Sequence, residues 1–347
     1  MRRLWLALLF LLSPALAADD FPIVTPGRNF EFPLDHGAHP TFRTEWWYVT
    51  GWLKTAEGRD LGFQVTFFRS RPKGVEDSPS RFTPRQVIFA HAALSDARIG
   101  HLLHDQRVAR QGFGLAEAAI GNTDLSLDGW SLRREHDGSF TAKIDSGEFS
   151  LDLLLTPTQP VLLQGEQGFS RKGPQAAEAS YYYSLPHLKV TGSAKGSQVA
   201  GEAWLDREWS SDMLDPKAIG WDWLAVNLED GGAVTAFQIR DQDGKALWAG
   251  GSWRDAAGKL VNLAPGDVLF EPAPAWHSPH TGADYPIECS ILLRGKRLIT
   301  KPLLADQELD SRPAGGPVYW EGAVTVGGDV LGKGYLELTG YAEKLSL

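Results

Sequence analysis

The chain of 347 residues carries 43 acidic and 34 basic side chains, a formal net charge of −9 and a single cysteine. An acidic chain is a poor partner for nucleic acid and for anionic lipid surfaces, and one cysteine excludes an internal disulfide. The length suits two domains better than one.

The N-terminal residues have the pattern of a secretory signal peptide. Arg2 and Arg3 precede the apolar residues 4–12, and Ala15-Leu16-Ala17 provides a cleavage signal with small residues. The apolar run is too short to span a bilayer, which disfavours a retained membrane anchor. We therefore expect residues 1–18 to be removed and the mature protein to be exported, with the periplasm of a Gram-negative bacterium as the most suitable location.

The remaining chain predicts an all-β protein. Apolar residues alternate with other residues in short runs such as 61–68 and 287–293, and a period of two is typical of strands. The pairs Asp137-Gly138 and Asp243-Gly244 are typical of hairpin turns. Many short strands at regular spacing indicate a sandwich or a barrel.

The chain divides most simply near Leu185-Pro186. Residues 19–184 and 185–347 then form two parts of about 150 residues each, which is the size of an eight-stranded barrel domain. Each part has one Trp-rich strand, with Trp46, Trp47 and Tyr48 in the first and Trp221 and Trp223 in the second.

Two histidines precede the first Trp-rich strand. His36 and His39 lie in a segment with loop character, and Glu45 begins the strand that follows. Imidazoles and a carboxylate can bind a metal, but this spacing matches no standard zinc pattern. We favour a loop at a barrel mouth, where the imidazoles form hydrogen bonds or transfer protons. No metal site is predicted.

The segment from Trp204 to Trp209 is the most unusual one, because three ionisable side chains interrupt an otherwise apolar strand. Side chains of a strand alternate between its two faces. Trp204, Asp206 and Glu208 therefore share one face, and Arg207 shares the other with Trp209.

Two interpretations of this strand stay open. Buried charges are retained when they are paired or used, so in the first interpretation Asp206, Arg207 and Glu208 form an ion network at the domain junction. In the second, burial raises the pKa of one carboxyl, which acts as a general acid, while Arg207 keeps the other ionised. These three residues are the candidate catalytic residues.

Thirteen tryptophans are many for a chain of this length. They either fill barrel interiors or line an apolar ligand cavity, and both roles can occur in one molecule. The chain has no Walker A loop, dinucleotide fingerprint or Gly-x-Ser-x-Gly elbow, which disfavours phosphoryl transfer and serine hydrolysis. The candidate ligand-binding residues are Trp46, Trp47, Tyr48, Trp204, Trp209, Trp221 and Trp223, together with Glu45, His36 and His39.

Several motifs together resemble the carotenoid 1,2-hydratase (hydroxyneurosporene synthase) and AttH-like family. The similarity extends from Phe30 to Tyr341 and is greater to the secreted AttH-like branch than to the hydratases. The motifs are residues 35–40, 45–51, 179–184, 201–209, 220–223, 306–308, 319–322 and 334–341.

The resemblance implies two lipocalin-like antiparallel β-barrels packed together. Hydratases of this family add water to an isoprenoid double bond without a cofactor, and the secreted branch tends to accompany transporter-like membrane proteins. The hydratases have histidine at the position of Arg207, and arginine cannot deliver a proton at neutral pH. This difference argues against hydratase activity and leaves an apolar-ligand role open.

We therefore predict an exported two-barrel protein that binds an apolar lipid or isoprenoid ligand and needs no cofactor. One alternative is a hydro-lyase in which Asp206 or Glu208 protonates an alkene. A cation–π contact with Trp204, Trp209 or Trp221 would then stabilise the carbocation. A second alternative is an accessory protein of a membrane transporter.

Overall fold

The computed structural model describes residues 21–75, 77–272 and 274–345. The predicted signal peptide, residues 1–18, lies outside this part of the chain. The described residues form strands and short 3-10 helices. None of these helices is long and apolar enough to cross a membrane.

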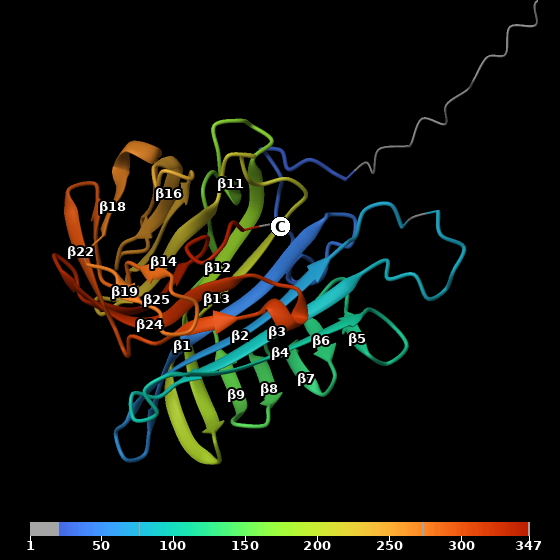
Figure 1. Ribbon diagram of the computed structural model, residues 1–347, viewed down its shortest axis with the longest axis horizontal. Helices are drawn as coiled ribbons and strands as arrows, with labels where there is room; N and C mark the ends of the chain where they lie inside the picture. Colours follow the sequence, from blue (N-terminus) through green and yellow to red (C-terminus); the bar gives the residue numbers. More distant parts are fainter. Residues whose placement is uncertain (1–20, 76, 273, 346–347) are drawn as a thin grey trace, which may run out of the picture.

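The strands belong to two large antiparallel sheets and one small sheet (Figure 1). The first sheet contains β1 (Thr44–Thr55), β2 (Asp60–Ser70), β3 (Val87–Ser95), β4 (Leu102–Arg110), β5 (Ala116–Ala118), β6 (Asp124–Leu127), β7 (Trp130–Arg134), β8 (Phe140–Asp145), β9 (Ser150–Thr156), β10 (Leu162–Leu163), β11 (Phe169–Arg171), β12 (Ala179–Ala194) and β13 (Ser197–Ser210). The second sheet contains β14 (Gly220–Leu228), β15 (Ala233–Arg240), β16 (Ala246–Arg254), β17 (Leu260–Leu263), β18 (Val268–Pro272), β21 (Cys289–Leu293), β22 (Lys296–Pro302), β23 (Glu308–Asp310), β24 (Val318–Gly328) and β25 (Gly332–Leu338). The small sheet pairs β19 (Trp276–His277) with β20 (Asp284–Tyr285), and the 3-10 helices are η1 (Leu34–His36), η2 (Pro265–Asp267) and η3 (Arg312–Ala314).

The two large sheets repeat one plan. Their strand orders are β4-β3-β2-β1-β13-β12-β9-β8-β7-β6-β5 and β17-β16-β15-β14-β25-β24-β22-β21-β18. In each sheet the first strand of a meander pairs with the last strand, β1 with β13 and β14 with β25. The sheets curl into two nearly closed, antiparallel, barrel-like bodies, which confirms the expectation of two packed β-barrels. Both Trp-rich segments lie on these first strands.

Each barrel has its own core. Alternate residues of β1, among them Trp47 and Val49, point into the first barrel and pack against Val65 and Phe67 of β2. Large apolar side chains fill the second barrel in the same manner, with Trp320 fully buried among them. The tryptophans inside the barrels therefore fill the barrel interiors, which is one of the two roles that the sequence suggested for them.

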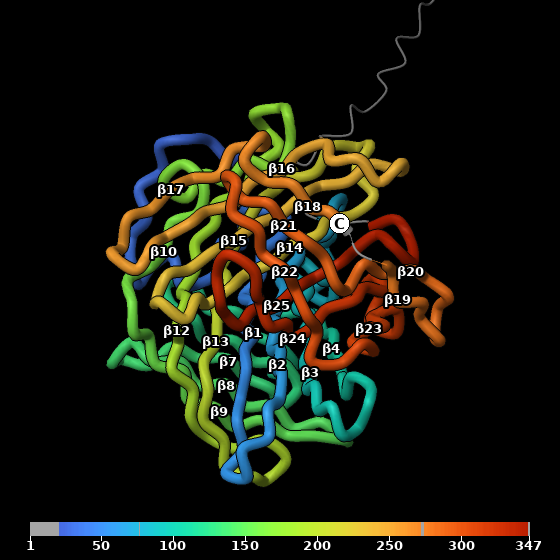
Figure 2. The backbone as a smooth tube through the Cα atoms, turned by 90° about the vertical axis from the view of Figure 1, so that its left-hand side faces the viewer, coloured from blue at the N-terminus to red at the C-terminus, as the bar shows by residue number. Residues whose placement is uncertain are grey.

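The opposite face of β1 packs against the second sheet. Figure 1 and Figure 2 show β14, β24 and β25 lying across β1 and its neighbours. Tyr48, Trp52 and Trp204 contact Trp223 and Tyr335 in one apolar cluster. The Trp52 indole donates a hydrogen bond to the carbonyl of residue 334 at 3.0 Å. The two barrels are thus packed against each other along an apolar interface, here called the seam, which hydrogen bonds also cross.

The sheets do not divide at residues 184 and 185. Both residues lie inside β12, and the first sheet continues to Ser210 before residues 211–219 connect it to β14. The register of β12 against β13 shifts between Leu185 and Leu188, and His187 has a φ of 52°. Pro186 has no N–H for the ladder, so it sits at a bulge within a strand instead of ending one.

Candidate functional site

A cavity of about 280 Å³ lies between the two sheets. One wall comes from the outward faces of β1, β2, β3 and β13, and the other from β14, β15, β24 and β25. Met213 and Leu214 of the connecting segment and Leu345, near the end of the chain, also line it. Neither barrel forms this site alone, because each contributes only one wall.

Aromatic rings cover much of the cavity wall. Trp46 and Tyr48 of β1 face Trp221 and Trp223 of β14, and Trp223 packs edge to face on Tyr48 at 5.2 Å between ring centroids. These four residues are among those the sequence singled out as ligand-binding. The sequence reasoning missed further lining rings, namely Phe68, Phe89, Phe237 and Tyr319.

The alternation along β13 separates its charges as expected. Asp206 and Glu208 line the cavity, whereas Arg207 points into the first barrel. The first of the two open interpretations, an ion network of Asp206, Arg207 and Glu208, is therefore wrong. In the second, the part given to Arg207 is wrong too, because Arg207 pairs with Glu45 and Lys172 pairs with Glu208. Neighbouring residues of a strand point to opposite faces, so an arginine between two carboxylates cannot reach either of them on its own strand.

Asp206 accepts three hydrogen bonds at the cavity wall. Its Oδ1 accepts from the Ser184 hydroxyl at 2.5 Å and the Trp204 indole at 2.6 Å. Its Oδ2 accepts from the Tyr182 hydroxyl at 2.7 Å. A carboxylate has about four acceptor sites, so one remains on Oδ2. Burial raises the pKa of Asp206 to about 7, against the opposing effect of these three donors.

Glu208 has a different environment although it shares the same face. Lys172 lies just beyond β11, and its Nζ is 3.0 Å from Glu208 Oε1. The Ser180 hydroxyl donates a further hydrogen bond to the same oxygen. Lys172 also lies over the Phe237 ring, 4.3 Å from its centroid. A buried carboxylate with a cation and a donor is an ion pair, so Glu208 is a poor candidate for a proton donor.

Two more carboxyls face the cavity from the second barrel. Glu321 on β24 stands directly opposite Glu337 on β25; Glu321 is buried and Glu337 is half-buried. Burial raises the pKa of Glu321 well above its usual value and that of Glu337 to about 8. The Glu337 carboxylate raises the pKa of Glu321 further, and the Asp206 and Glu208 carboxylates raise that of Glu337 further. The Gln64 amide donates to Glu321 Oε2 at 2.7 Å across the seam. The polar face of residues 335–341 is the sequence signal that points to Glu337.

No group of three or more His, Cys, Asp or Glu side chains in residues 21–75, 77–272 and 274–345 is arranged to hold a metal ion. His36 and His39, the two histidines that the sequence suggested as ligand-binding residues, do not line the cavity. His91 does, and its Nδ1 lies 2.8 Å from the Tyr319 hydroxyl. Burial lowers the pKa of His91 to about 3, so its ring is neutral.

Comparison with known proteins shows to which family the chain belongs. A family model described as AttH-like matches residues 23–341. The crystal structure of a Nitrosomonas europaea protein assigned as AttH is 53% identical, with a TM-score of 0.87, and the match covers 92% of this chain and 99% of that one. The chain belongs to the AttH-like family. This confirms the resemblance seen in the sequence.

The AttH-like chain also resembles more distant solved structures. Kievitone hydratase from Nectria haematococca is 15% identical with a TM-score of 0.69, over 94% of this chain and 95% of that one. CghA with Sch210972 is 14% identical with a TM-score of 0.53, over 88% and 89% of the two chains. At these identities the similarity concerns the fold. A search of curated proteins gave no match.

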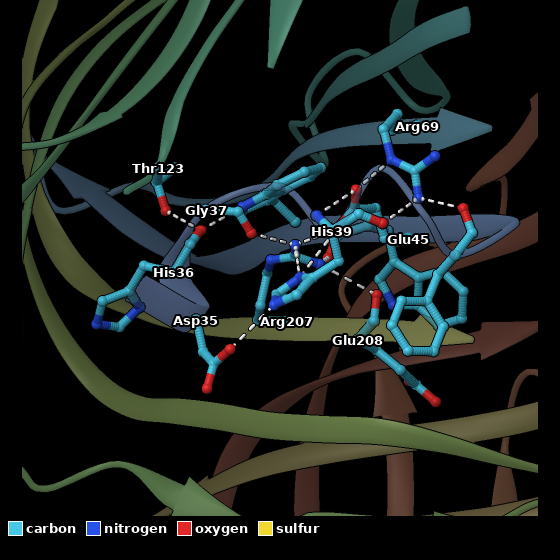
Figure 3. A network of polar contacts seen from close by, with 12 residues as sticks. Asp35, His36, Gly37, His39, Glu45, Arg69, Thr123, Arg207 and Glu208 are labelled. Carbon is cyan, nitrogen blue, oxygen red and sulfur yellow. Dashed lines mark hydrogen bonds and ion pairs between the residues drawn. The ribbon is translucent and has the colours of Figure 1, made fainter. Parts of the chain in front are cut away.

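The remaining candidate residues of this AttH-like chain lie inside the first barrel, in a second polar cluster (Figure 3). Glu45 is fully buried and accepts hydrogen bonds from Arg69 and Arg207. Although burial opposes ionisation, these two guanidinium groups hold the pKa of Glu45 well below its usual value. Arg207 also donates to the Gly37 carbonyl at 2.6 Å and lies 3.8 Å from the centroid of Trp47. The network ties the loop before β1 to the barrel wall.

The two histidines of that loop belong to the same cluster. His39 stacks on Trp209 with 3.8 Å between ring centroids and bonds Asp35 at 3.0 Å. His36 bonds the Tyr183 hydroxyl at 2.6 Å, and burial lowers its pKa to about 3. The candidate residues therefore fall into two groups. Six of them line the cavity, namely Trp46, Tyr48, Asp206, Glu208, Trp221 and Trp223, and six lie away from it, namely Glu45, His36, His39, Trp47, Arg207 and Trp209. Trp204 does not line the cavity, but its indole donates a hydrogen bond to Asp206, which does.

Proposed function

We propose that the protein binds a small apolar molecule in the cavity between its two barrels. The aromatic wall that Trp46, Tyr48, Trp221 and Trp223 form along a partly open cavity is the observation that carries this proposal. Ligand pockets are largely apolar with a few converging polar groups, and this cavity has that composition. The carboxyls on its walls would orient the ligand.

Displacement of the apolar dye N-phenyl-1-naphthylamine tests this proposal. The dye should become fluorescent in the cavity, and Trp46→Leu should weaken its binding roughly tenfold because the ring loses its apolar contact. Trp276→Leu, a change on the small sheet of the second barrel, should leave binding unchanged. Native mass spectrometry of the purified protein should also show a bound apolar molecule. Dye binding that ignores the Trp46 change would contradict the proposed site.

A second candidate function, a cofactor-independent hydro-lyase, is favoured by Asp206. Its proton is held with a pKa of about 7 beside an apolar space, and a general acid works best when its pKa is near the working pH. In the proposed reaction the Asp206 proton forms a C–H bond with one alkene carbon. Water adds to the resulting carbocation, and the proton that this water loses returns to the Asp206 carboxylate.

Two neighbours support this chemistry. Trp46 and Trp221 line the same space and can stabilise a carbocation through their ring faces, a role that Trp204 and Trp209 cannot fill from their positions. Fold similarity to kievitone hydratase, a protein named for hydration, adds an argument by analogy.

Incubation with acyclic terpenes and carotenoids tests the reaction. Asp206→Asn keeps the shape of the side chain but holds no transferable carboxyl proton, so product formation should fall by about 10²- to 10⁴-fold. Asp145→Asn, at the exposed end of β8, is the control and should keep full activity. Turnover that persists in Asp206→Asn would exclude this residue as the acid.

We also propose that the mature protein is exported, on the strength of residues 1–18. Sequencing the N-terminus of protein recovered from the periplasm tests this, and an intact Met1 in a cytoplasmic fraction would contradict it. An accessory role beside a membrane transporter stays a prediction, which co-purification with neighbouring membrane proteins would examine.

A further inference from the structure

Two buried polar side chains that face each other across the seam are poorly satisfied within the described chain. Tyr48 is 6% exposed and Glu321 2%, and although the two side chains interact with each other, neither the Tyr48 hydroxyl nor Glu321 Oε1 makes a hydrogen bond of good geometry. Both residues line the cavity. Buried polar atoms in proteins nearly always have well-placed partners, so these two groups on facing walls are suited to a further partner from a ligand in the cavity.

The Tyr48 and Glu321 side chains lie close enough to interact. Tyr48 stands on β1 directly opposite Thr66 of β2, and Gln64 on the same strand reaches across to Glu321. Burial raises the pKa of Tyr48, and the nearby Glu321 carboxyl raises it further. The tyrosine is therefore a permanent hydroxyl donor, and its contact with Glu321 falls short of a hydrogen bond of good geometry.

Glu321 and its cross-strand neighbour Glu337 are not both ionised at the same time. Like charges directly opposite each other on adjacent strands repel, and burial removes the water that would screen them. At neutral pH the pair therefore retains at least one proton, as carboxyl pairs in enclosed sites do. Such a pair both donates and accepts a hydrogen bond.

We propose that Tyr48, Glu321 and Glu337 form a subsite for one hydroxyl group of the ligand, which makes the ligand a neutral alcohol or phenol with an apolar body. A hydroxyl is one donor and two acceptors. It can donate to Glu321 Oε1 and accept from Tyr48, which gives both groups a well-placed partner. This inference rests on the proposed binding of an apolar molecule in the same cavity.

The charges around the cavity argue against a carboxylic acid as the ligand. Asp206 and Glu208 line the same space as the carboxyl pair. Among the described lining residues the cations are Lys172, which pairs with Glu208 at 3.0 Å, and Arg69, which pairs with Glu45. A carboxylate ligand would add another negative charge without an unpaired cation to receive it.

Competition of three related terpenes with N-phenyl-1-naphthylamine tests the subsite. Geraniol, geranic acid and myrcene share similar apolar bodies and differ in bearing a hydroxyl, a carboxylate or neither. At neutral pH geraniol should bind roughly tenfold tighter than myrcene, and geranic acid more weakly than geraniol. Tyr48→Phe should weaken geraniol roughly three- to tenfold and leave myrcene unchanged. Tyr285→Phe, a buried tyrosine of the second barrel bonded to Glu308, is the matched control and should not change the ratio.

Each other outcome overturns the inference in a recognisable way. Equal binding of geraniol and myrcene would remove the hydroxyl subsite and leave the proposed apolar-ligand function intact. An unchanged ratio in Tyr48→Phe, with a lower melting temperature, would show that this hydroxyl serves the protein alone. Failure of all three compounds to displace the dye or to bind in native mass spectrometry would reject the proposed function and the subsite together.

Discussion

Replacement of Glu45 by glutamine should strongly destabilise the first barrel. Glu45 is fully buried between Arg69 and Arg207, and it also accepts hydrogen bonds from the backbone N–H of His39 at 3.0 Å. Glutamine keeps the shape but leaves two buried guanidinium groups without their counter-charge. Breaking one buried pair costs about 3–5 kcal/mol, and loss of both charge pairs points to the upper end of that range.

This cost can be measured as a change in melting temperature. At roughly 2–4 °C per kcal/mol for a barrel of this size, Glu45→Gln should lower the transition by about 6–20 °C. Circular dichroism with heat and urea would follow it, and the exposed Glu148→Gln would serve as the control, within about 0.5 kcal/mol of the wild type. A Glu45→Gln protein as stable as the wild type would refute the structural role assigned to this network.

The same residue gives the wild type a pH dependence. The unfolded chain protonates Glu45 near its ordinary value of 4.5, whereas the arginines keep the pKa of the folded form lower. The stabilisation is therefore present above pH 4.5 and is lost as the pH falls below it. Acid titration of Glu45→Gln should lack this part of the loss.

Three further predictions concern the cavity and the seam. Since burial raises the pKa of Asp206 to about 7, kcat/KM for any hydration should fall as the pH rises through that value, because the acid form disappears. Gly62→Ala should cost about 1–3 kcal/mol in urea denaturation, since its new methyl group would lie 2.6 Å from the Ala323 Cβ across the seam. Lys172→Met should cost about 3–5 kcal/mol, because it leaves Glu208 buried without its cation, and adding Glu208→Gln should restore part of the loss.

Each of these has a clear contrary result. A kcat/KM that stays constant from acid to alkaline pH would contradict Asp206 as the acid. Gly147→Ala places its methyl group in open space and should change stability by less than about 0.5 kcal/mol, so an equal effect at both glycines would show that the seam is not tightly packed. A double variant of Lys172 and Glu208 with simply additive losses would mean that the two do not interact.

The sequence predicts the fold well because strands leave a local pattern. A period of two assigns each side chain to a face, and it correctly separated Asp206 from Arg207 along β13. It could not tell which partner meets each face. Arg207 pairs with Glu45, a residue 162 positions away, and no local pattern reports such a contact. The interpretation of β13 as an ion network among neighbouring residues is wrong for this reason.

The same limit explains the other gaps in the sequence reasoning. Glu321 and Glu337 lie next to each other only because β24 pairs with β25, although the polar face of the latter strand is visible in the sequence. Pro186 has the local signature of a break, yet hydrogen bonding on either side of it continues one long strand. Local signals locate strands and bends, while tertiary pairing decides what they do.

The repeated plan of the two barrels has a consequence for how ligand preference changes. Among the described residues, no strand of one large sheet pairs with a strand of the other, so the cavity walls are outward faces that carry no share of the other sheet's ladder. A substitution on one wall reshapes the binding space without disturbing the backbone of the facing barrel. Wall residues of the two barrels can therefore be varied one barrel at a time, and combining halves from different relatives offers a direct route to new binding specificities.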